Sequence, residues 1–151
     1  MRVYLVIMDD TDEARKALRF ASRRAMATGA AVHILALVAK QNFNAFGSVQ
    51  ATIEQEARDR AEVMASSAAG NLFSESGKMP VISVKTGEGQ AVIKEYLAEH
   101  PEVGALVLGA AADGSPGPLI THFSAHSGSL PCPLYIVPGN FSNDEIDRLT
   151  E

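Results

Sequence analysis

The N-terminal sequence Val3-Tyr4-Leu5-Val6-Ile7-Met8-Asp9-Asp10-Thr11 places six apolar residues directly before two carboxylates and a threonine. An apolar run of this length is too short for a helix and is typical of a strand buried on both faces of a parallel sheet. Ligands of such sheets bind outside the carboxyl ends of the strands. Asp9 and Asp10 are therefore expected at this edge, where they would bind a metal, orient a nucleotide or favour the start of a helix.

The overall composition is that of one ordinary globular domain, with 46% hydrophobic and 21% charged residues in a chain of 151. The net charge of −5 argues against nucleic acid as a partner. No apolar stretch approaches the ~20 residues of a membrane span, and Met1-Arg2 leads into a strand rather than a signal peptide. We therefore expect a cytoplasmic protein without a membrane partner. Cys132 is the single cysteine, which excludes an internal disulfide and a cysteine-based zinc site.

Apolar strands alternate with amphipathic helices along the chain. The predicted strands cover about residues 2–8, 32–38, 80–85, 104–108 and 134–137, and the predicted helices about 11–28, 49–69, 90–99 and 119–127. This alternation predicts an α/β fold, a doubly wound five-stranded parallel sheet with helices on both faces. Two strand orders are common for such a sheet, 2-1-3-4-5 and 3-2-1-4-5.

Single residues set several of the predicted boundaries. Thr11 is a good N-cap for the first helix, and Gly29 is its expected left-handed end. Gly70 is expected to lie just beyond the second helix. Residues 39–48 and 71–78 are predicted as loops, the second of them mobile.

Basic residues are unevenly distributed. Those of the first helix are expected to face solvent; they are Arg15, Lys16, Arg19 and Arg23. After Lys94 no Lys or Arg occurs until Arg148, so an anion bound by the C-terminal half would rely on backbone N–H groups, hydroxyls, histidines or a metal ion. Residues 140–151 are expected to form a tail with a short helix capped by Ser142 or Asn143.

In the order 3-2-1-4-5, the loops after the first and fourth strands border one crevice. The first loop carries Asp9 and Asp10, and the second, residues 109–118, is rich in glycine and leads into a helix. Glycines allow close backbone approach, and a helix N-terminus offers unpaired N–H groups to an anion. The pattern predicts a nucleotide pocket, with a flexible, ligand-free loop as the alternative. It is not a P-loop, because no Gly-Lys-Ser/Thr sequence ends it.

Other motifs favour structural roles. A phosphorylatable receiver domain would need an Asp at the end of the third strand and a Lys at the end of the fifth, but these ends are Val84-Lys85-Thr86 and Val137-Pro138-Gly139. Gly87-Glu88-Gly89 lacks the third glycine of a dinucleotide fingerprint and predicts a tight turn between strand and helix. Asp10 and Asp12 are expected to favour the positive end of the first helix.

Candidate catalytic and metal-binding side chains are few. His122 and His126 are four residues apart and share one helix face, but no third ligand is nearby, so a hydrogen-bonding or interface role is expected. His33 lies in mid-strand and is expected to be a core or edge histidine. Cys132 has no adjacent base and is predicted to be structural. No Ser, His and Asp set lies in a nucleophile-elbow context, so we predict no catalytic residue and no metal site.

Taken in order, four segments resemble a universal stress protein domain. They are Val6-Ile7-Met8-Asp9-Asp10-Thr11-Asp12-Glu13-Ala14, Lys85-Thr86-Gly87-Glu88-Gly89, Ala105-Leu106-Val107-Leu108-Gly109 and Pro131-Cys132-Pro133-Leu134-Tyr135-Ile136-Val137. The resemblance assigns residues 1–138 to this domain and residues 139–151 to a C-terminal tail. It implies the strand order 3-2-1-4-5 and a homodimer joined through the last strand, Leu134 to Val137.

The resemblance also implies an adenine-nucleotide site for ATP or AMP, with Mg²⁺ if the ligand is ATP. Nucleotide-binding members carry G-x2-G-x9-G-[ST] after the fourth strand, and this chain keeps Gly109 but has other residues at the next positions, Ala112, His122 and Phe123. Gly114, Ser115 and Gly117 would supply a displaced cradle, with Thr121 offering a hydroxyl. Asp9 and Val38 would contact the adenosine end.

These observations favour a small, non-catalytic binding or regulatory module of the stress response, with a weak adenine-nucleotide site and an unidentified protein partner. Two alternatives remain open. One is a nucleotide-dependent enzyme, such as a weak ATPase, that uses the same crevice. The other is a ligand-free homodimer that acts by protein interaction alone.

Overall fold

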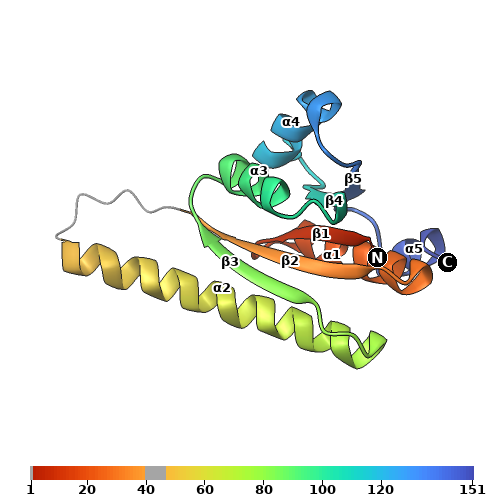
Figure 1. The fold of residues 1–151 in the computed structure, drawn as a ribbon, viewed down its shortest axis with the longest axis horizontal. Coiled ribbons are helices and arrows are strands. Elements are labelled where there is room, and N and C mark those ends of the chain that lie inside the picture. The colour runs from red at the N-terminus through yellow and green to blue at the C-terminus, as the bar shows by residue number, and fades with distance from the viewer. Residues whose placement is uncertain (1, 40–46) are drawn as a thin grey trace.

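Five parallel strands form one sheet in the computed structural model, which describes residues 2–39 and 47–151. The sheet has the order β3-β2-β1-β4-β5. The elements are β1 (Val3–Met8), α1 (Asp12–Thr28), β2 (Ala31–Val38), α2 (Gly47–Ser76), β3 (Val81–Thr86), α3 (Gly89–Glu99), β4 (Val103–Ala110), α4 (Pro118–Ala125), the 3-10 helix η1 (Ser127–Ser129), β5 (Leu134–Pro138) and α5 (Asn143–Leu149) (Figure 1). The predicted fold class is confirmed, and of the two orders considered the chain adopts 3-2-1-4-5.

The central strand β1 is buried along its whole length. Alternate side chains enter two separate cores. Tyr4, Val6 and Met8 pack with α1 and α2, whereas Val3, Leu5 and Ile7 pack with α3 and α4. Figure 1 shows α2 on one side of the sheet and α3 and α4 on the other. A fully buried aliphatic side chain contributes about 1.5–3 kcal/mol, so this apolar run stabilises both layers at once.

Helix α1 begins and ends as predicted. The Thr11 hydroxyl accepts a hydrogen bond from the Ala14 backbone N–H at 3.2 Å, and Gly29 ends the helix in the left-handed conformation with φ 74°. Small side chains on its inner face, such as Ala17 and Ala21, are fully buried, so the helix lies close against the sheet. This close approach matters for the site described below.

Helix α2 is longer than predicted. It continues through Gly70 to Ser76, and Gly77, with φ 74°, ends it instead. The predicted loop at 71–78 is therefore wrong for most of its length. A glycine inside a helix costs about 1 kcal/mol, and burial of Ala69 and Leu72 on either side of Gly70 offsets this cost. Of the predicted loop 39–48, residues 40–46 lie outside the described residues.

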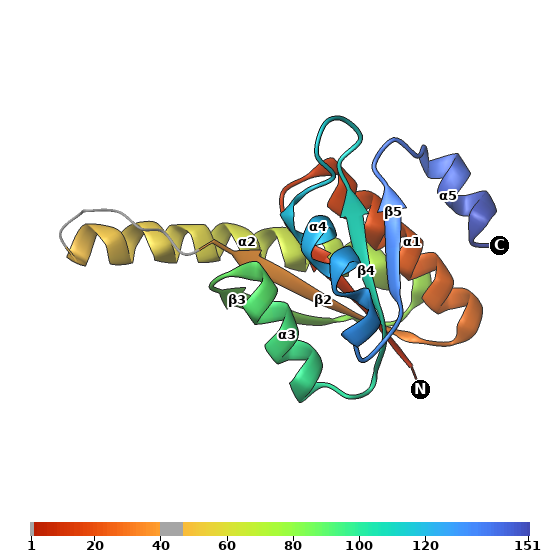
Figure 2. The same cartoon turned by 90° about the horizontal axis from the view of Figure 1, so that it is seen from above.

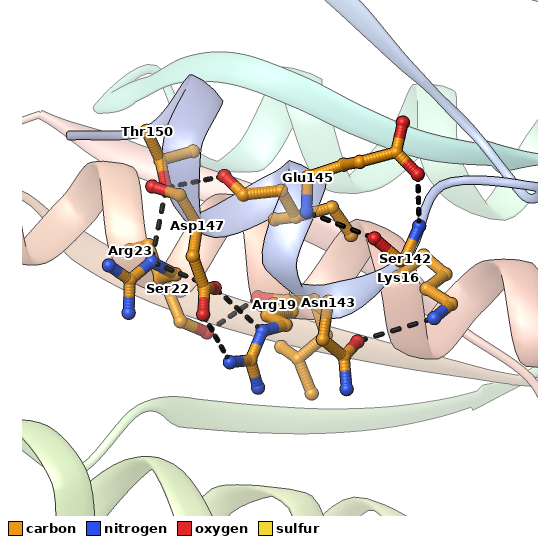
Figure 3. Close-up of polar contacts among 11 residues, drawn as sticks. Lys16, Arg19, Ser22, Arg23, Ser142, Asn143, Glu145, Asp147 and Thr150 are labelled. Carbon is orange, nitrogen blue, oxygen red and sulfur yellow. Dashed lines mark hydrogen bonds and ion pairs between the residues drawn. The ribbon is translucent and has the colours of Figure 1, made fainter.

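The C-terminal segment is an ordered part of the fold. Helix α5 lies beside α1 at the β5 edge of the sheet, and Ile146 is completely buried in the core on that side (Figure 2). Ser142 caps it, as one of the two predicted residues, through a reciprocal pair of hydrogen bonds with Glu145, both 3.1 Å. Polar contacts with α1 complete the attachment (Figure 3).

The expectation that Arg19 and Arg23 of α1 face only solvent is wrong. Both form ion pairs with Asp147 of α5, and Arg23 Nε also donates to the Thr150 hydroxyl at 3.1 Å. Lys16 Nζ donates to the Asn143 side chain at 3.2 Å. Within residues 2–39 and 47–151, every helix is too short or too polar to span a lipid bilayer.

Candidate functional site

A crevice opens where β1 and β4 separate. The two strands pair from Val3 to Val6 of β1, and the pairing stops at Val6 and Val107, although β4 continues to Ala110. The space between the strand ends is a cavity of about 220 Å³. Asp9 and Thr11 line it from the β1 side, and Gly109 and Gly117 line it from the β4 side. The structure thus brings together four residues from two segments about 100 positions apart in the sequence.

The Asp9 carboxylate is oriented by its neighbour two residues on. The Thr11 hydroxyl donates a hydrogen bond to Asp9 Oδ1 while it accepts one from the Ala14 backbone N–H. The Thr11 hydroxyl therefore links the Asp9 carboxylate to the N-cap of α1. Asp9 itself is exposed and lines the cavity. Asp10 points elsewhere and forms an exposed ion pair with Arg15 at 3.4 Å.

Gly109 is required by the packing of α1 against β4. A Cβ atom at this position would lie 2.1 Å from the Glu13 backbone oxygen and 3.1 Å from the Ala14 nitrogen. No side chain fits at such distances. The close contact with the first turn of α1 therefore requires a glycine at position 109. This requirement does not depend on a bound phosphate.

The glycine loop after β4 reaches the cavity only with its second half. Pro116, Gly117 and Pro118 line the cavity, whereas Gly114 and Ser115 are exposed and are not among its lining residues. Gly117 has φ 114°, a conformation that a side chain would strain. The loop is closed by a hydrogen bond from the Ala111 N–H to the Pro116 oxygen at 3.1 Å.

Thr121 is one turn into α4, and its hydroxyl donates to the Gly117 carbonyl oxygen at 3.1 Å. The side chain is exposed and does not line the cavity. Of the proposed displaced cradle, the structure thus brings Gly117 to the crevice and leaves Gly114, Ser115 and Thr121 outside it.

A second cavity, of about 560 Å³, adjoins the other side of Asp9. Val38 and Asp9, the two residues predicted for the adenosine end, both line it. Helix α2 supplies the opposite wall with Ala57, Arg60 and Met64. Of the described residues, Asp9 is the one that borders both cavities.

Sequence reasoning missed the contribution of α2. Ala57, Ala61 and Met64 follow the spacing of one helix face, which indicates that this face is inward. The same pattern does not say that Arg60 reaches the carboxyl end of β1. That placement depends on how α2 crosses the sheet, which only the tertiary structure decides.

The two cavities differ in charge. Among the described residues, those lining the smaller cavity include the carboxylates of Asp9 and Glu13 and no Lys or Arg. The larger cavity has Arg60 beside Asp9, Asp10 and Asp59. Positive character at the smaller cavity comes from backbone N–H groups in the first turn of α4. Its first residue, Pro118, has no N–H, so the groups available are those of Leu119 and Ile120, after the N-cap Gly117.

The remaining candidate side chains take structural positions. Glu88 caps α3 by accepting hydrogen bonds from Gln90 N at 3.1 Å and Ala91 N at 2.9 Å, so the Gly87-Glu88-Gly89 segment is the predicted turn. His33 is buried, and its Nδ1 lies 2.7 Å from the Tyr96 hydroxyl. Burial, followed by the charge of His100, lowers the pKa of His33. Burial raises the pKa of Cys132, which disfavours the reactive thiolate.

His122 and His126 lie side by side on α4 and its C-terminal end, with ring centroids 4.4 Å apart. His126 Nδ1 lies 2.8 Å from the His122 carbonyl oxygen. In the described part of the chain, no three His, Cys, Asp or Glu side chains are grouped so as to hold a metal ion.

Comparisons with known proteins agree with this architecture. The sequence model of the universal stress protein family matches residues 1–138. A search of curated protein sequences found no match. Among solved structures, universal stress protein UspA from Lactobacillus plantarum is similar, with 19% identity, 90% of this chain and 97% of that chain covered, and a TM-score of 0.77.

Two further similar structures are ligand complexes. A universal stress protein in complex with cAMP shares 14% identity over 90% of this chain and 96% of that one, with a TM-score of 0.57. A universal stress protein family protein from Arabidopsis thaliana with AMP bound shares 15% identity over 91% of this chain and 92% of that one, also with a TM-score of 0.57. These structures support the fold, and the family model covers most of the sequence. The chain belongs to the universal stress protein family.

Proposed function

We propose that the crevice beside Asp9 binds an adenine nucleotide with a single phosphate, and that the chain acts as a non-catalytic, cytoplasmic binding module of the stress response. The observation that carries this proposal is the position of Asp9, which borders both the cavity of about 560 Å³ and the cavity of about 220 Å³. A nucleotide has two unlike ends, a base and a phosphate, joined by a ribose with hydroxyl groups. Asp9 stands where the ribose would lie.

Each part of the ligand meets suitable chemistry. The base would occupy the larger cavity against Val38, Ala57 and Met64, which are apolar. The ribose hydroxyls would donate to the Asp9 carboxylate, which the Thr11 hydroxyl already orients. The phosphate would lie against Gly109 and Gly117 and the first N–H groups of α4.

The charge of the smaller cavity favours one phosphate over three. Asp9 and Glu13 are the titratable side chains among the described residues that line it, and both are acidic. A triphosphate would bring more negative charge to this place without a Lys or Arg to balance it, so ATP would depend on Mg²⁺. Two similar structures carry cAMP and AMP.

The affinity should be modest, because backbone N–H groups bind phosphate less well than a complete cradle with Lys. We propose a Kd in the range of about tens of micromolar, or roughly −6 kcal/mol. Among the described residues that line the smaller cavity, the Thr11 hydroxyl is already hydrogen-bonded to Asp9 and to the Ala14 N–H, which favours binding over catalysis.

Isothermal titration calorimetry with AMP, cAMP and ATP, the last with and without Mg²⁺, tests the proposal. Tighter binding of AMP or cAMP than of metal-free ATP supports it. Tighter binding of metal-free ATP would contradict the charge argument. The absence of heat for all four ligands would favour the ligand-free interaction module, and ATP hydrolysis at the crevice would favour the enzyme.

The assembly that we propose is a two-fold homodimer through β5. This strand is at one edge of the sheet, and Ile136 on it is 42% exposed. An edge strand offers unpaired backbone groups to another strand. A second copy of the same edge would satisfy both chains at once.

A further inference from the structure

A further concave surface lies between α3 and α4, at the opposite end of the sheet from the crevice. Its volume is about 750 Å³, within the range of small-molecule sites. It is bordered by Val103, the first residue of β4, and by Pro131, which precedes β5. The crevice lies at Gly109 near the other end of β4, roughly 20 Å away along the strand. Figures 1 and 2 show α3 and α4 side by side on the same face of the sheet, with α4 the nearer of the two to β4.

The groove has an apolar floor and a polar rim. Leu97, Val103 and Phe123 are buried side chains that belong to the second core and also line the groove. The polar lining residues are Lys94, His100, His122, His126 and Ser129. The ionisable members of this set are one lysine and three histidines, all of which are basic side chains.

Two of the histidines are held in fixed orientations. His100 stacks on Tyr96 at a centroid distance of 3.9 Å, and its Nδ1 lies 2.9 Å from the Tyr96 carbonyl oxygen. His126 stacks on His122 at 4.4 Å, with Nδ1 at 2.8 Å from the His122 carbonyl oxygen. A carbonyl oxygen only accepts, so Nδ1 carries the proton in both rings. Nε2 is then the ring nitrogen left for a ligand, and it becomes a donor when the imidazole is protonated.

The acidic side chains of these segments lie outside the groove lining, and the charge of Glu102 acts on His33 and Tyr96 beside His100. Among the described residues that line the groove, none is Asp or Glu. The nearby carboxylates in the same segments, Glu95, Glu99 and Glu102, are exposed and lie outside the lining. The other titratable groups packed here are His33 and Tyr96 below His100, and Cys132 after Pro131.

We propose that this groove binds an amphiphilic organic anion, a carboxylate attached to an aromatic or aliphatic body. The body lies on Leu97, Val103 and Phe123, and the carboxylate accepts hydrogen bonds from the Lys94 ammonium and from Nε2 of protonated His100 or His126. Charge complementarity selects an anion, and the apolar floor selects a ligand that is more than an inorganic ion. A protonated histidine adds a donor and a positive charge, so the binding strengthens as the pH falls.

Two probes with the same body separate these contributions. The full chain, labelled with ¹⁵N, is titrated with 1-naphthoate and with 1-naphthalenemethanol at pH 6 and pH 8, and amide shifts are followed by NMR. We expect shifts at residues of α3, of α4 and of the segment after α4. Naphthoate should bind at least about tenfold more tightly than the alcohol at pH 6, and this ratio should fall at pH 8.

Variants of single lining residues provide the matched test. Lys94→Gln and His126→Gln should each weaken naphthoate binding about three- to tenfold and leave the alcohol unchanged. Lys85→Gln, at an exposed lysine on β3 outside the groove, is the control and should change neither ligand. Lys94 is exposed, so Lys94→Gln should fold normally. It therefore tests the carboxylate contact even if replacement of the stacked His126 disturbs the end of α4.

Several results would overturn the proposal. These are equal binding of the two probes, a pH-independent ratio, shifts at Asp9 rather than at α3 and α4, or no shift with millimolar naphthoate. Shifts of the groove residues on raising the protein concentration alone would assign the groove to a second copy of the chain instead. AMP should not displace naphthoate, so the outcome is independent of the nucleotide site.

Discussion

Arg19 of α1 and Asp147 of α5 are joined by two hydrogen bonds, from Arg19 Nε to Asp147 Oδ1 at 2.8 Å and from Arg19 Nη2 to Oδ2 at 2.7 Å. The residues are 128 positions apart in the sequence. Arg23 adds a third contact to the same carboxylate at 3.1 Å. This bidentate pair attaches the C-terminal helix to the first helix, next to the buried Ile146.

The pair predicts a pH-dependent stability. The hydrogen bonds from Arg19, followed by the charges of Arg19 and Arg23, lower the pKa of Asp147 in the folded chain. The stabilisation is therefore complete above the pKa of an unfolded Asp, about 3.9, and is lost as the pH falls through the lower folded value. Asp147→Asn should reduce the urea midpoint at pH 7, and the difference from wild type should shrink at pH 3.

Asp113→Asn, at an exposed carboxylate in the loop before α4, is the control for removing one negative charge. It should leave the urea midpoint close to wild type at both pH values. An Asp147→Asn difference that stays constant from pH 7 to pH 3 would show that the carboxylate contributes through packing rather than through its charge.

Gly109→Ala should destabilise the fold. The added methyl would meet the Glu13 backbone oxygen at 2.1 Å, and backbone atoms cannot rotate away as a flexible side chain can. We expect a loss of at least about 1–3 kcal/mol, the usual cost of overpacking. Urea unfolding followed by circular dichroism measures it. An unchanged midpoint would mean that α1 shifts away from β4 at no cost.

Gly70→Ala should have the opposite effect. Gly70 lies inside α2, and a Cβ there has no atom within 4 Å. Alanine should raise the free energy of unfolding by about 0.5–1 kcal/mol, because it has the better helix propensity. Gly77→Ala is the matched contrast. Gly77 also has open space around it but a φ of 74°, so its replacement should destabilise by about 1–2 kcal/mol.

Asp9→Ala should weaken AMP binding about tenfold or more, the effect of removing a hydrogen bond to a charged group. Asp12→Ala should change the affinity less than about twofold, since Asp12 lies in the first turn of α1 and outside both cavities. Calorimetry on both variants measures the difference. Asp9→Asn keeps an acceptor for the Thr11 hydroxyl, so it separates the lost charge from a disturbed helix cap. Equal losses for Asp9→Ala and Asp12→Ala would contradict the proposed site.

Ile136→Lys should convert the proposed dimer to a monomer, because a charge at the centre of a paired edge strand is unfavourable. Sedimentation velocity at micromolar concentration distinguishes the two states. Val81→Lys is the matched control, since Val81 lies on β3, the opposite edge strand, and is 51% exposed against 42% for Ile136. A monomeric wild type, or an equal effect of both lysines, would rule out assembly through β5.

Local patterns in the sequence were enough to predict most elements. The run from Val3 to Met8 predicts a doubly buried strand because only such a strand has no polar side, and all six residues are buried. Thr11 and Gly29 predict both ends of α1, because capping and the left-handed conformation depend on one residue and its near neighbours. The position of Asp9 beside the end of β1 follows from the same local reasoning.

Tertiary packing decided what local patterns could not. Helix α2 runs through Gly70 because burial of Ala69 and Leu72 outweighs the cost of one glycine, a balance that sequence propensity does not include. The crossing of α2 over the sheet brings Arg60 to the cavity beside Asp9, and the fold of the loop after β4 leaves Gly114 and Ser115 outside it.

The charged face of α1 also shows the difference between local pattern and tertiary packing. By itself, the sequence determined that Arg19 and Arg23 lie on a polar helix face, because that follows from a period of 3.6 residues. Their partner, Asp147, comes from the far end of the chain. The position of Asp147 beside these arginines depends on the burial of Ile146, which holds α5 against α1. Hydrophobic burial of one residue thus selects which charges meet, and only the folded chain contains that information.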